Sequence, residues 1–176
     1  IMEGGSLKDM IIDRYNNDSN YLFTDEECSI IMKNLLEGLD YLHSNQVMHR
    51  DIKPDNIMFK VKDNLQTLKI ADFGLARDVN DTRLDSKCGT LIFMAPEMIN
   101  QSSYDCSIDL FAAGFVMYIL CSGGMHPFYE DGMDKDTYLL KYKTRNNWCF
   151  PDHFPLLARN LFMKLCKDNR TFRYDT

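Results

Sequence analysis

The strongest constraint on the fold is the stretch Ser107–Ser122, which is apolar on nearly every side and has Asp109 as its one charged residue. A helix with apolar side chains all round is stable only when every face is buried. Its uninterrupted apolar part, Leu110–Cys121, is too short to cross a bilayer. The sequence therefore predicts a helix at the centre of a globular body, with other helices packed around it.

Three further segments have apolar residues at helical spacing. The first follows Ser6, which together with Asp9 resembles a helix cap with an acid in the first turn. The second begins at a capping box formed by Thr24 and Glu27. The apolar positions of this helix and of a last helix near the C-terminus are Ile31, Leu35, Leu39, Leu42, Leu157, Leu161 and Leu165.

Residues 56–61 and 65–71 have the pattern of two short strands joined by a turn. Residues 74–90 lack periodicity and mix charged with small residues, which indicates a long functional loop. The predicted fold class is mainly α (α+β overall), a helical body with one short β-hairpin.

The chain has 20 basic and 26 acidic residues and a formal charge of −6, which argues against a nucleic-acid partner. No segment resembles a secretory leader or a membrane span. We expect a cytoplasmic protein that could also enter the nucleus. The six cysteines lack the spacing of a zinc site, and reduced, packed thiols are favoured over disulfides.

Three motifs follow one another in an order that chance would rarely produce. They are His49-Arg50-Asp51-Ile52-Lys53-Pro54-Asp55-Asn56, then Asp72-Phe73-Gly74, then Ala95-Pro96-Glu97. With them, the chain closely resembles the protein kinase family, specifically the large helical C-terminal lobe of a serine/threonine kinase. The segments around Cys88-Gly89-Thr90 and Gly124–Phe128 are most similar to the calcium/calmodulin-dependent kinase group.

The resemblance implies a catalytic apparatus for transfer of the γ-phosphoryl group of ATP to protein serine or threonine hydroxyls. Asp51 would be the catalytic base, and Lys53 would neutralise the migrating phosphoryl group. Thr90 would support both residues through hydrogen bonds. Asn56 and Asp72 would supply oxygen ligands to Mg²⁺. Taken singly, such Asp and Asn residues more often cap turns.

The resemblance also implies nucleotide contacts. Besides Lys53, Asn56 and Asp72, the expected residues are Met2 at the hinge, Ser6 near the ribose and Met58 beneath the adenine. Met2 and Met58 could equally be ordinary core residues.

Arg50 suggests regulation, because an arginine beside the catalytic Asp needs an anion to order it. A phosphate on Ser86, with Arg77 as a second cation, would supply that anion. An upstream activating kinase would then be a partner. Thr82 is the second candidate, and a plain solvated serine at position 86 is the alternative.

Structural roles are implied for the remaining motif residues. Glu97 would pair with Arg173, and Asp109 would accept bonds from the His49–Arg50 backbone or merely cap its helix. His49 and Phe73 belong to the same framework, and Gly74 would let the backbone turn sharply. The acids Asp55, Glu130, Asp131, Asp134 and Asp136 would either attract a basic peptide or form a solvated surface.

The 176 residues contain no glycine-rich phosphate loop, no Val-Ala-Ile-Lys-like lysine and no partner glutamate for it. We therefore expect residues 1–176 to be a partial kinase domain, comprising the hinge end and the C-terminal lobe, truncated at both ends. The fragment alone should be weak or inactive. The alternative is an inactive lobe that binds peptides or a partner kinase. The sequence leaves calmodulin dependence open.

Overall fold

A computed structural model describes residues 2–17, 22–79, 88–145 and 147–173. Within these ranges the α-helices are α1 (Leu7–Asn17), α2 (Asp25–Ser44), α3 (Pro96–Ile99), α4 (Ser107–Cys121), α5 (Lys135–Thr144) and α6 (Leu156–Leu165). The strands are β1 (Val47–Met48), β2 (Ile57–Phe59), β3 (Leu68–Ile70) and β4 (Arg77–Asp78). Single 3₁₀ turns occur at Pro54–Asn56, Leu65–Thr67, Phe73–Leu75, Leu91–Phe93 and Arg170–Phe172.

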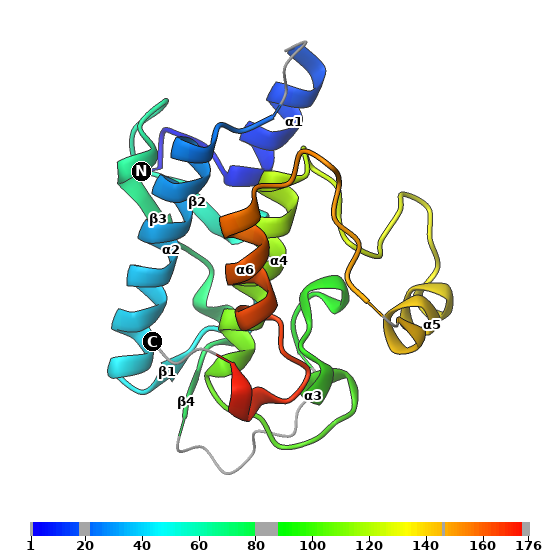
Figure 1. Ribbon diagram of the computed structural model, residues 1–176. Coiled ribbons are helices and arrows are strands. Elements are labelled where there is room, and N and C mark those ends of the chain that lie inside the picture. Colours follow the sequence, from blue (N-terminus) through cyan, green and yellow to red (C-terminus); the bar gives the residue numbers. More distant parts are fainter. Residues whose placement is uncertain (1, 18–21, 80–87, 146, 174–176) are drawn as a thin grey trace.

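Helix α4 is the centre of the molecule, with α2 and α6 packed along it (Figure 1). All its residues from Ile108 to Cys121 are buried, which confirms the prediction from its apolar sequence. A Cβ at Gly114 would overlap Sγ of Cys166, so the absence of a side chain lets the two segments approach closely. Phe115 continues the contact, with its ring stacked against that of Phe162.

Helix α2 begins as predicted. Thr24 accepts a hydrogen bond from the N–H of Glu27, whose carboxylate accepts one from the N–H of Thr24. The buried side of the helix is formed by Cys28, Ile31, Met32, Leu35 and Leu39. The cap fixes where the helix starts, and the apolar stripe turns that face toward α4.

The predicted hairpin is present but shorter than expected. Strands β2 and β3 pair antiparallel, with Ile57 opposite Ile70, while residues 65–67 form a 3₁₀ turn instead of strand. A second pair, β1 with β4, was not predicted, and β4 lies within the segment 74–90 assigned to loop. Strands of two residues show no alternation that sequence could reveal. Helix α5 was also not predicted. Its buried residues are Tyr138 and Tyr142, and the others form no apolar stripe.

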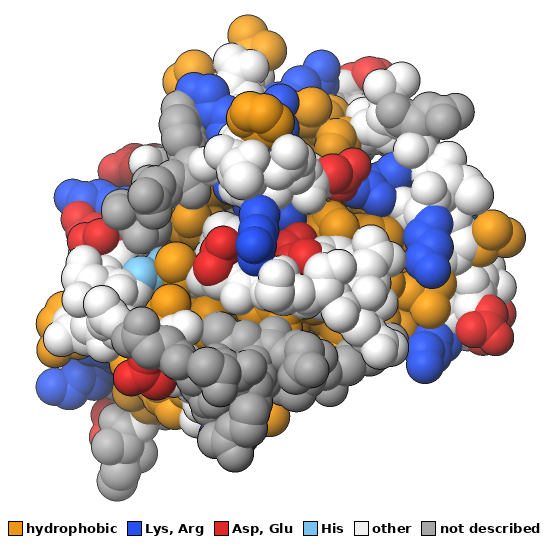
Figure 2. Space-filling view, turned by 90° about the horizontal axis from the view of Figure 1, so that it is seen from below, with side chains coloured by type: hydrophobic (Ala, Val, Ile, Leu, Met, Phe, Trp, Pro, Cys, Tyr) orange, Lys and Arg blue, Asp and Glu red, His pale blue; other side chains and the backbone are white. Residues whose placement is uncertain are grey.

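The surface seen from below Figure 1 mixes both signs of charge (Figure 2). Lys and Arg side chains lie among Asp and Glu side chains, with apolar side chains between them. Despite the net charge of −6, this face is therefore not uniformly negative. None of the helices in the described part of the chain is long and apolar enough to cross a membrane.

Candidate active site

The motif 49–56 connects β1 to β2 and is held to α4 by hydrogen bonds. Asp109, which is 1% exposed, accepts hydrogen bonds from the backbone N–H groups of His49 and Arg50, each at 2.8 Å. The Nε2 atom of His43 lies 3.0 Å from the same carboxylate. The cap position of α4 is Cys106, so Asp109 is no N-cap. The backbone bonds expected of Asp109 are present, and they anchor the motif to the buried core.

His49 sets the start of the motif through its ring. Its Nδ1 atom accepts the N–H of Asp51 at 3.3 Å, so Nε2 carries the proton and donates to the carbonyl oxygen of Ala71 at 2.9 Å. The ring also meets the edge of the Phe73 ring at a centroid distance of 5.1 Å. His49 therefore links the two motifs that the sequence singled out.

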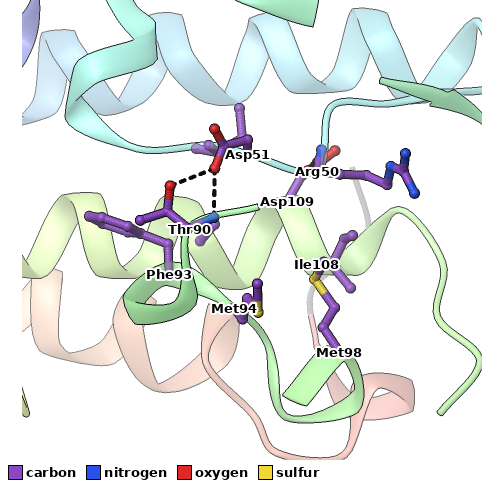
Figure 3. Close-up of a pocket in the computed structure, with 10 residues that line it drawn as sticks. Arg50, Asp51, Thr90, Phe93, Met94, Met98, Ile108 and Asp109 are labelled. Atoms are coloured by element: carbon purple, nitrogen blue, oxygen red, sulfur yellow. Dashed lines mark hydrogen bonds between the residues drawn. The ribbon is translucent and has the colours of Figure 1, made fainter. Parts of the chain in front are cut away.

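Asp51 is the meeting point of three predicted catalytic residues. Its Oδ1 atom accepts the backbone N–H of Thr90 at 2.8 Å and the Thr90 hydroxyl at 2.9 Å (Figure 3). Its Oδ2 atom accepts from Nζ of Lys53 at 2.7 Å and from Nδ2 of Asn56 at 3.1 Å. Lys53 also donates to the Thr90 hydroxyl at 2.8 Å. All four acceptor positions of the carboxylate are thus occupied.

These contacts determine the charge of Asp51. Burial acts to raise the pKa of its carboxyl, but hydrogen bonds from Lys53 and Thr90 outweigh burial and hold that pKa below its ordinary value. Asp51 is therefore an ionised carboxylate at neutral pH. A group that approaches it must displace one of its present donors, and the side chain of Lys53 is partly exposed, at 20%.

Asn56 and Asp72 are brought together by the strand pairing. The N–H of Ala71 donates to the carbonyl oxygen of Asn56 at 2.9 Å, and the exposed Asp72 follows directly. With the amide nitrogen of Asn56 donating to Asp51, its amide oxygen is the atom left to face a cation. An amide oxygen and a carboxylate suit Mg²⁺, which completes its octahedral shell with water and phosphate oxygens. This donor set fits the expected ion.

The backbone after Asp72 differs in detail from the prediction. The sharp turn is at Asp72 itself, whose φ of 60° is left-handed, and Gly74 is not among the positive-φ residues. The N–H of Gly74 donates to Oδ1 of Asp72 at 3.2 Å, and a Cβ on Gly74 would lie 3.1 Å from that oxygen. The glycine is therefore suited by its small size, and the expectation that it makes the turn was wrong.

The predicted nucleotide-contact residues lie along one edge of β2. Gly4 donates to the carbonyl oxygen of Phe59 at 3.0 Å, and Ser6 pairs with Met58 through an isolated β-bridge. Met2 is 39% exposed. Ser6 is buried and caps α1, with its hydroxyl donating to Asp9 at 2.7 Å. The adenine and ribose roles of these residues stay predictions.

The predicted regulatory residues are only partly described. Arg50 is buried and points away from Asp51 (Figure 3), donating to the carbonyl oxygen of Leu75 at 2.6 Å and to the Tyr104 hydroxyl at 3.0 Å. Arg77 lies in β4 opposite Met48. Ser86 and Thr82 fall outside the described residues. Regulation by phosphate at this place stays a prediction.

Gly89 is a site residue whose role the sequence did not reveal. Its φ is +92°, and a Cβ there would lie 2.5 Å from the carbonyl oxygen of Arg50. Only glycine combines this backbone conformation with so close an approach. The close approach is what brings Thr90 against Asp51.

The segment after Thr90 is fixed from a second side by residues that were also missed. The carbonyl oxygen of Ile92 accepts from Nε2 of His126 at 2.8 Å and from the Tyr138 hydroxyl at 3.1 Å. Nδ1 of His126 accepts the N–H groups of Phe128 and Tyr129. Burial lowers the pKa of His126 to about 4, so the ring is neutral as these bonds require. In the sequence His126 is only one of four scattered histidines.

The end of the segment is pinned by Glu97 and Arg173. Both side chains are buried, and Nη2 of Arg173 donates to Oε2 of Glu97 at 2.8 Å alongside a second bond to Oε1. The predicted pairing is present. Between 90–98, the motif at 49–52 and the start of α4, a space of only about 10 Å³ remains, in the region drawn in Figure 3. The two segments therefore pack as one unit.

Comparison with known proteins assigns this arrangement to a family. The family model described as "Protein kinase domain" matches residues 1–176. The chain belongs to the protein kinase family. This confirms the fold and the family expected from the three motifs.

Three relatives illustrate the match. A probable myosin light chain kinase of Dictyostelium discoideum is 38% identical over 131 residues, covering 74% of this chain and 26% of the relative. Myosin light chain kinase A of the same organism is 30% identical over 155 residues, 88% of this chain and 49% of the relative. Human MAP kinase-activated protein kinase 2 is 38% identical over 131 residues, 74% and 32% respectively. The chain thus spans less than half the length of these relatives.

Proposed function

We propose that this chain carries the catalytic loop of a serine/threonine protein kinase, which transfers the γ-phosphoryl group of Mg·ATP to serine or threonine hydroxyls of protein substrates. The observation that carries the proposal is the convergence of Lys53, Thr90 and Asn56 on the carboxylate of Asp51. A buried but ionised carboxylate beside a partly exposed ammonium is suited to phosphoryl transfer, which needs positioning and charge neutralisation more than covalent chemistry.

The roles of the residues follow from their contacts. The substrate hydroxyl takes the place of Lys53 at Oδ2 of Asp51, which orients the hydroxyl and accepts its proton as the oxygen–phosphorus bond forms and ADP leaves. The ammonium of Lys53, still within reach of Thr90, turns to the migrating phosphoryl group and neutralises its charge. Thr90 keeps Asp51 oriented throughout. Mg²⁺ bound by Asn56 and Asp72 would neutralise the negative charge of the ATP phosphates.

The choice of serine or threonine over tyrosine rests on Lys53 and Thr90. Lys53 lies two residues after Asp51, has an extended backbone, and donates hydrogen bonds to the Asp51 carboxylate and the Thr90 hydroxyl. Together these groups limit the space beside Asp51. We propose that this suits a short aliphatic hydroxyl better than a phenol.

The test is Mg·ATP-dependent phosphate transfer to two peptide libraries. In one library the only hydroxyl residues are serine and threonine, and in the other the only hydroxyl residue is tyrosine. The test uses this chain and the whole protein encoded by its gene, each compared with its Asp51→Asn variant. Transfer to the serine/threonine library that disappears in the variant is the expected result for the whole protein. If the folded whole protein transfers no phosphate while it still binds Mg·ATP, the enzyme proposal fails and the peptide-binding lobe is the remaining reading.

A further inference from the structure

An apolar groove lies between α2, α4 and the start of α6, and none of its lining residues belongs to the motif 49–56. Its volume is about 390 Å³. Met32, Leu36, Met117 and Leu161 are among its lining residues, and so are two cysteines, Cys28 and Cys121. The groove gives a small uncharged molecule a route from solvent to these two thiols.

The two cysteines lie on neighbouring helices, α2 and α4, that pack against each other. Cys28 lies in the first turns of α2 and Cys121 is the last residue of α4. Both side chains are buried, at 7% and 6% exposure, and both line the groove. The interaction between the two thiols lowers the pKa of Cys28 and raises the pKa of Cys121. The direction of these shifts favours Cys28 as the thiolate of the pair.

Cys166 and Cys149 have different surroundings. Cys166 is fully buried, and its thiol donates to the carbonyl oxygen of Phe111 at 3.6 Å. Burial raises the pKa of Cys166 well above its ordinary value. Cys149 is exposed. Cys28 and Cys121 are distinguished from these two cysteines by the groove that they share.

We propose that Cys28 and Cys121 are a redox site, which closes to a reversible disulfide between α2 and α4 when a peroxide enters the groove. The thiolate of Cys28 attacks the peroxide O–O bond, which gives a sulfenic acid and, with hydrogen peroxide, one water. Cys121 then attacks the Cys28 sulfur and expels a second water as the S–S bond forms. Two thiols lose two electrons and one peroxide gains them, so the step balances. A dithiol reductant reverses it.

The disulfide would close a loop that runs from Cys28 to Cys121 and contains the whole catalytic motif. A cross-link over so long a loop removes many conformations from the unfolded chain. The oxidised protein should therefore unfold at a higher temperature than the reduced one, by about 5–10 °C. This effect is independent of phosphoryl transfer, so it is measured without an activity assay.

The experiment exposes the folded wild-type chain to hydrogen peroxide, blocks remaining thiols with iodoacetamide, and maps cross-linked peptides by mass spectrometry. The expected product is a Cys28–Cys121 cross-link that disappears with dithiothreitol and raises the melting temperature. A Cys149→Ser variant should give the same product. In Cys121→Val, which keeps a small apolar side chain, Cys28 should be trapped as a sulfenic acid by dimedone.

Alkylation of both Cys28 and Cys121 after peroxide treatment, with an unchanged melting temperature, overturns the proposal. A disulfide that links either residue to Cys88, Cys106, Cys149 or Cys166 overturns it as well. If Cys121→Val does not fold, the wild-type map and its melting temperature still decide the question. Cys166 serves as the buried reference thiol and should stay reduced.

Discussion

Glu97 and Arg173 form a buried two-bond ion pair that joins the end of the segment after Thr90 to the chain after α6. The guanidinium also donates to the carbonyl oxygen of Lys167 at 2.7 Å and lies over the Phe111 ring at 4.9 Å from its centroid. Arg173 thereby connects α3, α4 and the segment after α6. Its charge is taken from water, so the pair stabilises the fold only while both partners are present.

The first prediction follows from this burial. Glu97→Gln leaves a buried guanidinium without its counter-charge and should lower the free energy of unfolding by about 3–5 kcal/mol. The exposed pair of Glu130 with Lys141 is the matched control, and Glu130→Gln should produce no measurable change. Urea unfolding followed by circular dichroism measures both. Equal effects of the two substitutions would contradict the assignment of Glu97–Arg173 as a structural pair.

The second prediction concerns Thr90. Thr90→Val removes the hydroxyl that donates to Asp51 and accepts from Lys53, but keeps the backbone N–H. A lost hydrogen bond to a charged group should reduce phosphate transfer by about 10- to 100-fold. The pKa of Asp51 should rise, so the acid limb of the rate profile moves to higher pH. Thr90→Ser restores the hydroxyl and should transfer at close to the parent's rate; a Ser variant as slow as Val would sink the idea.

The third prediction separates two demands on Gly89. In Gly89→Ala the new Cβ is strained by a left-handed φ of +92° and also clashes with the carbonyl oxygen of Arg50. In Gly132→Ala the φ of +82° causes similar strain, but no atom lies within 4 Å of the new Cβ. Gly132→Ala should cost about 1 kcal/mol in stability, the backbone strain alone. Gly89→Ala should cost more and should also abolish phosphate transfer, because Thr90 is displaced. Thermal unfolding and transfer assays on both variants check this, and matching losses would disprove the steric argument.

The fourth prediction concerns acid stability and His126. Its pKa is about 4 in the folded protein because of burial, against an ordinary value of 6.5. Between these values the unfolded chain binds the proton and the folded chain does not, so stability is complete above pH 6.5 and falls as the pH drops toward 4. The loss should reach roughly 3 kcal/mol.

Urea midpoints measured from pH 7 to pH 4 test this, with His126→Asn expected to be less stable at pH 7 but to lose less on acidification. His153 is exposed, and His153→Asn is the control that should keep the parent's slope. An unchanged slope in His126→Asn would assign the acid sensitivity to another group.

The parts of the fold that could be predicted from the sequence are those in which the buried face follows from the periodic spacing of apolar residues within one segment. Helix α4 is apolar all round and α2 has both a stripe and a capping box, so each could be placed from its own residues. Helix α5 could not, because its burial depends on two tyrosines that meet His126 and Arg145 in space. The β1–β4 pair is two residues long and joins segments far apart in sequence.

The site was predicted for a different reason. Asp51, Lys53 and Asn56 are neighbours in sequence, and their resemblance to a known family supplied Thr90, Asp72 and Asp109. The residues that were missed act through the backbone or through long-range contacts. Gly89 is defined by an approach to Arg50, and His126 by a bond to Ile92. Neither relationship leaves a local pattern that a sequence could display.

The fully engaged carboxylate of Asp51 has a consequence for kinetics. While Lys53 donates to Oδ2, an incoming hydroxyl competes with a cation of the protein itself. Phosphate oxygens attract that ammonium away, and its departure vacates the position that the hydroxyl needs. If the proposed function holds, a nucleotide already in place prepares the position for the hydroxyl, and this geometry favours a compulsory-order mechanism in which ATP binds before the protein substrate.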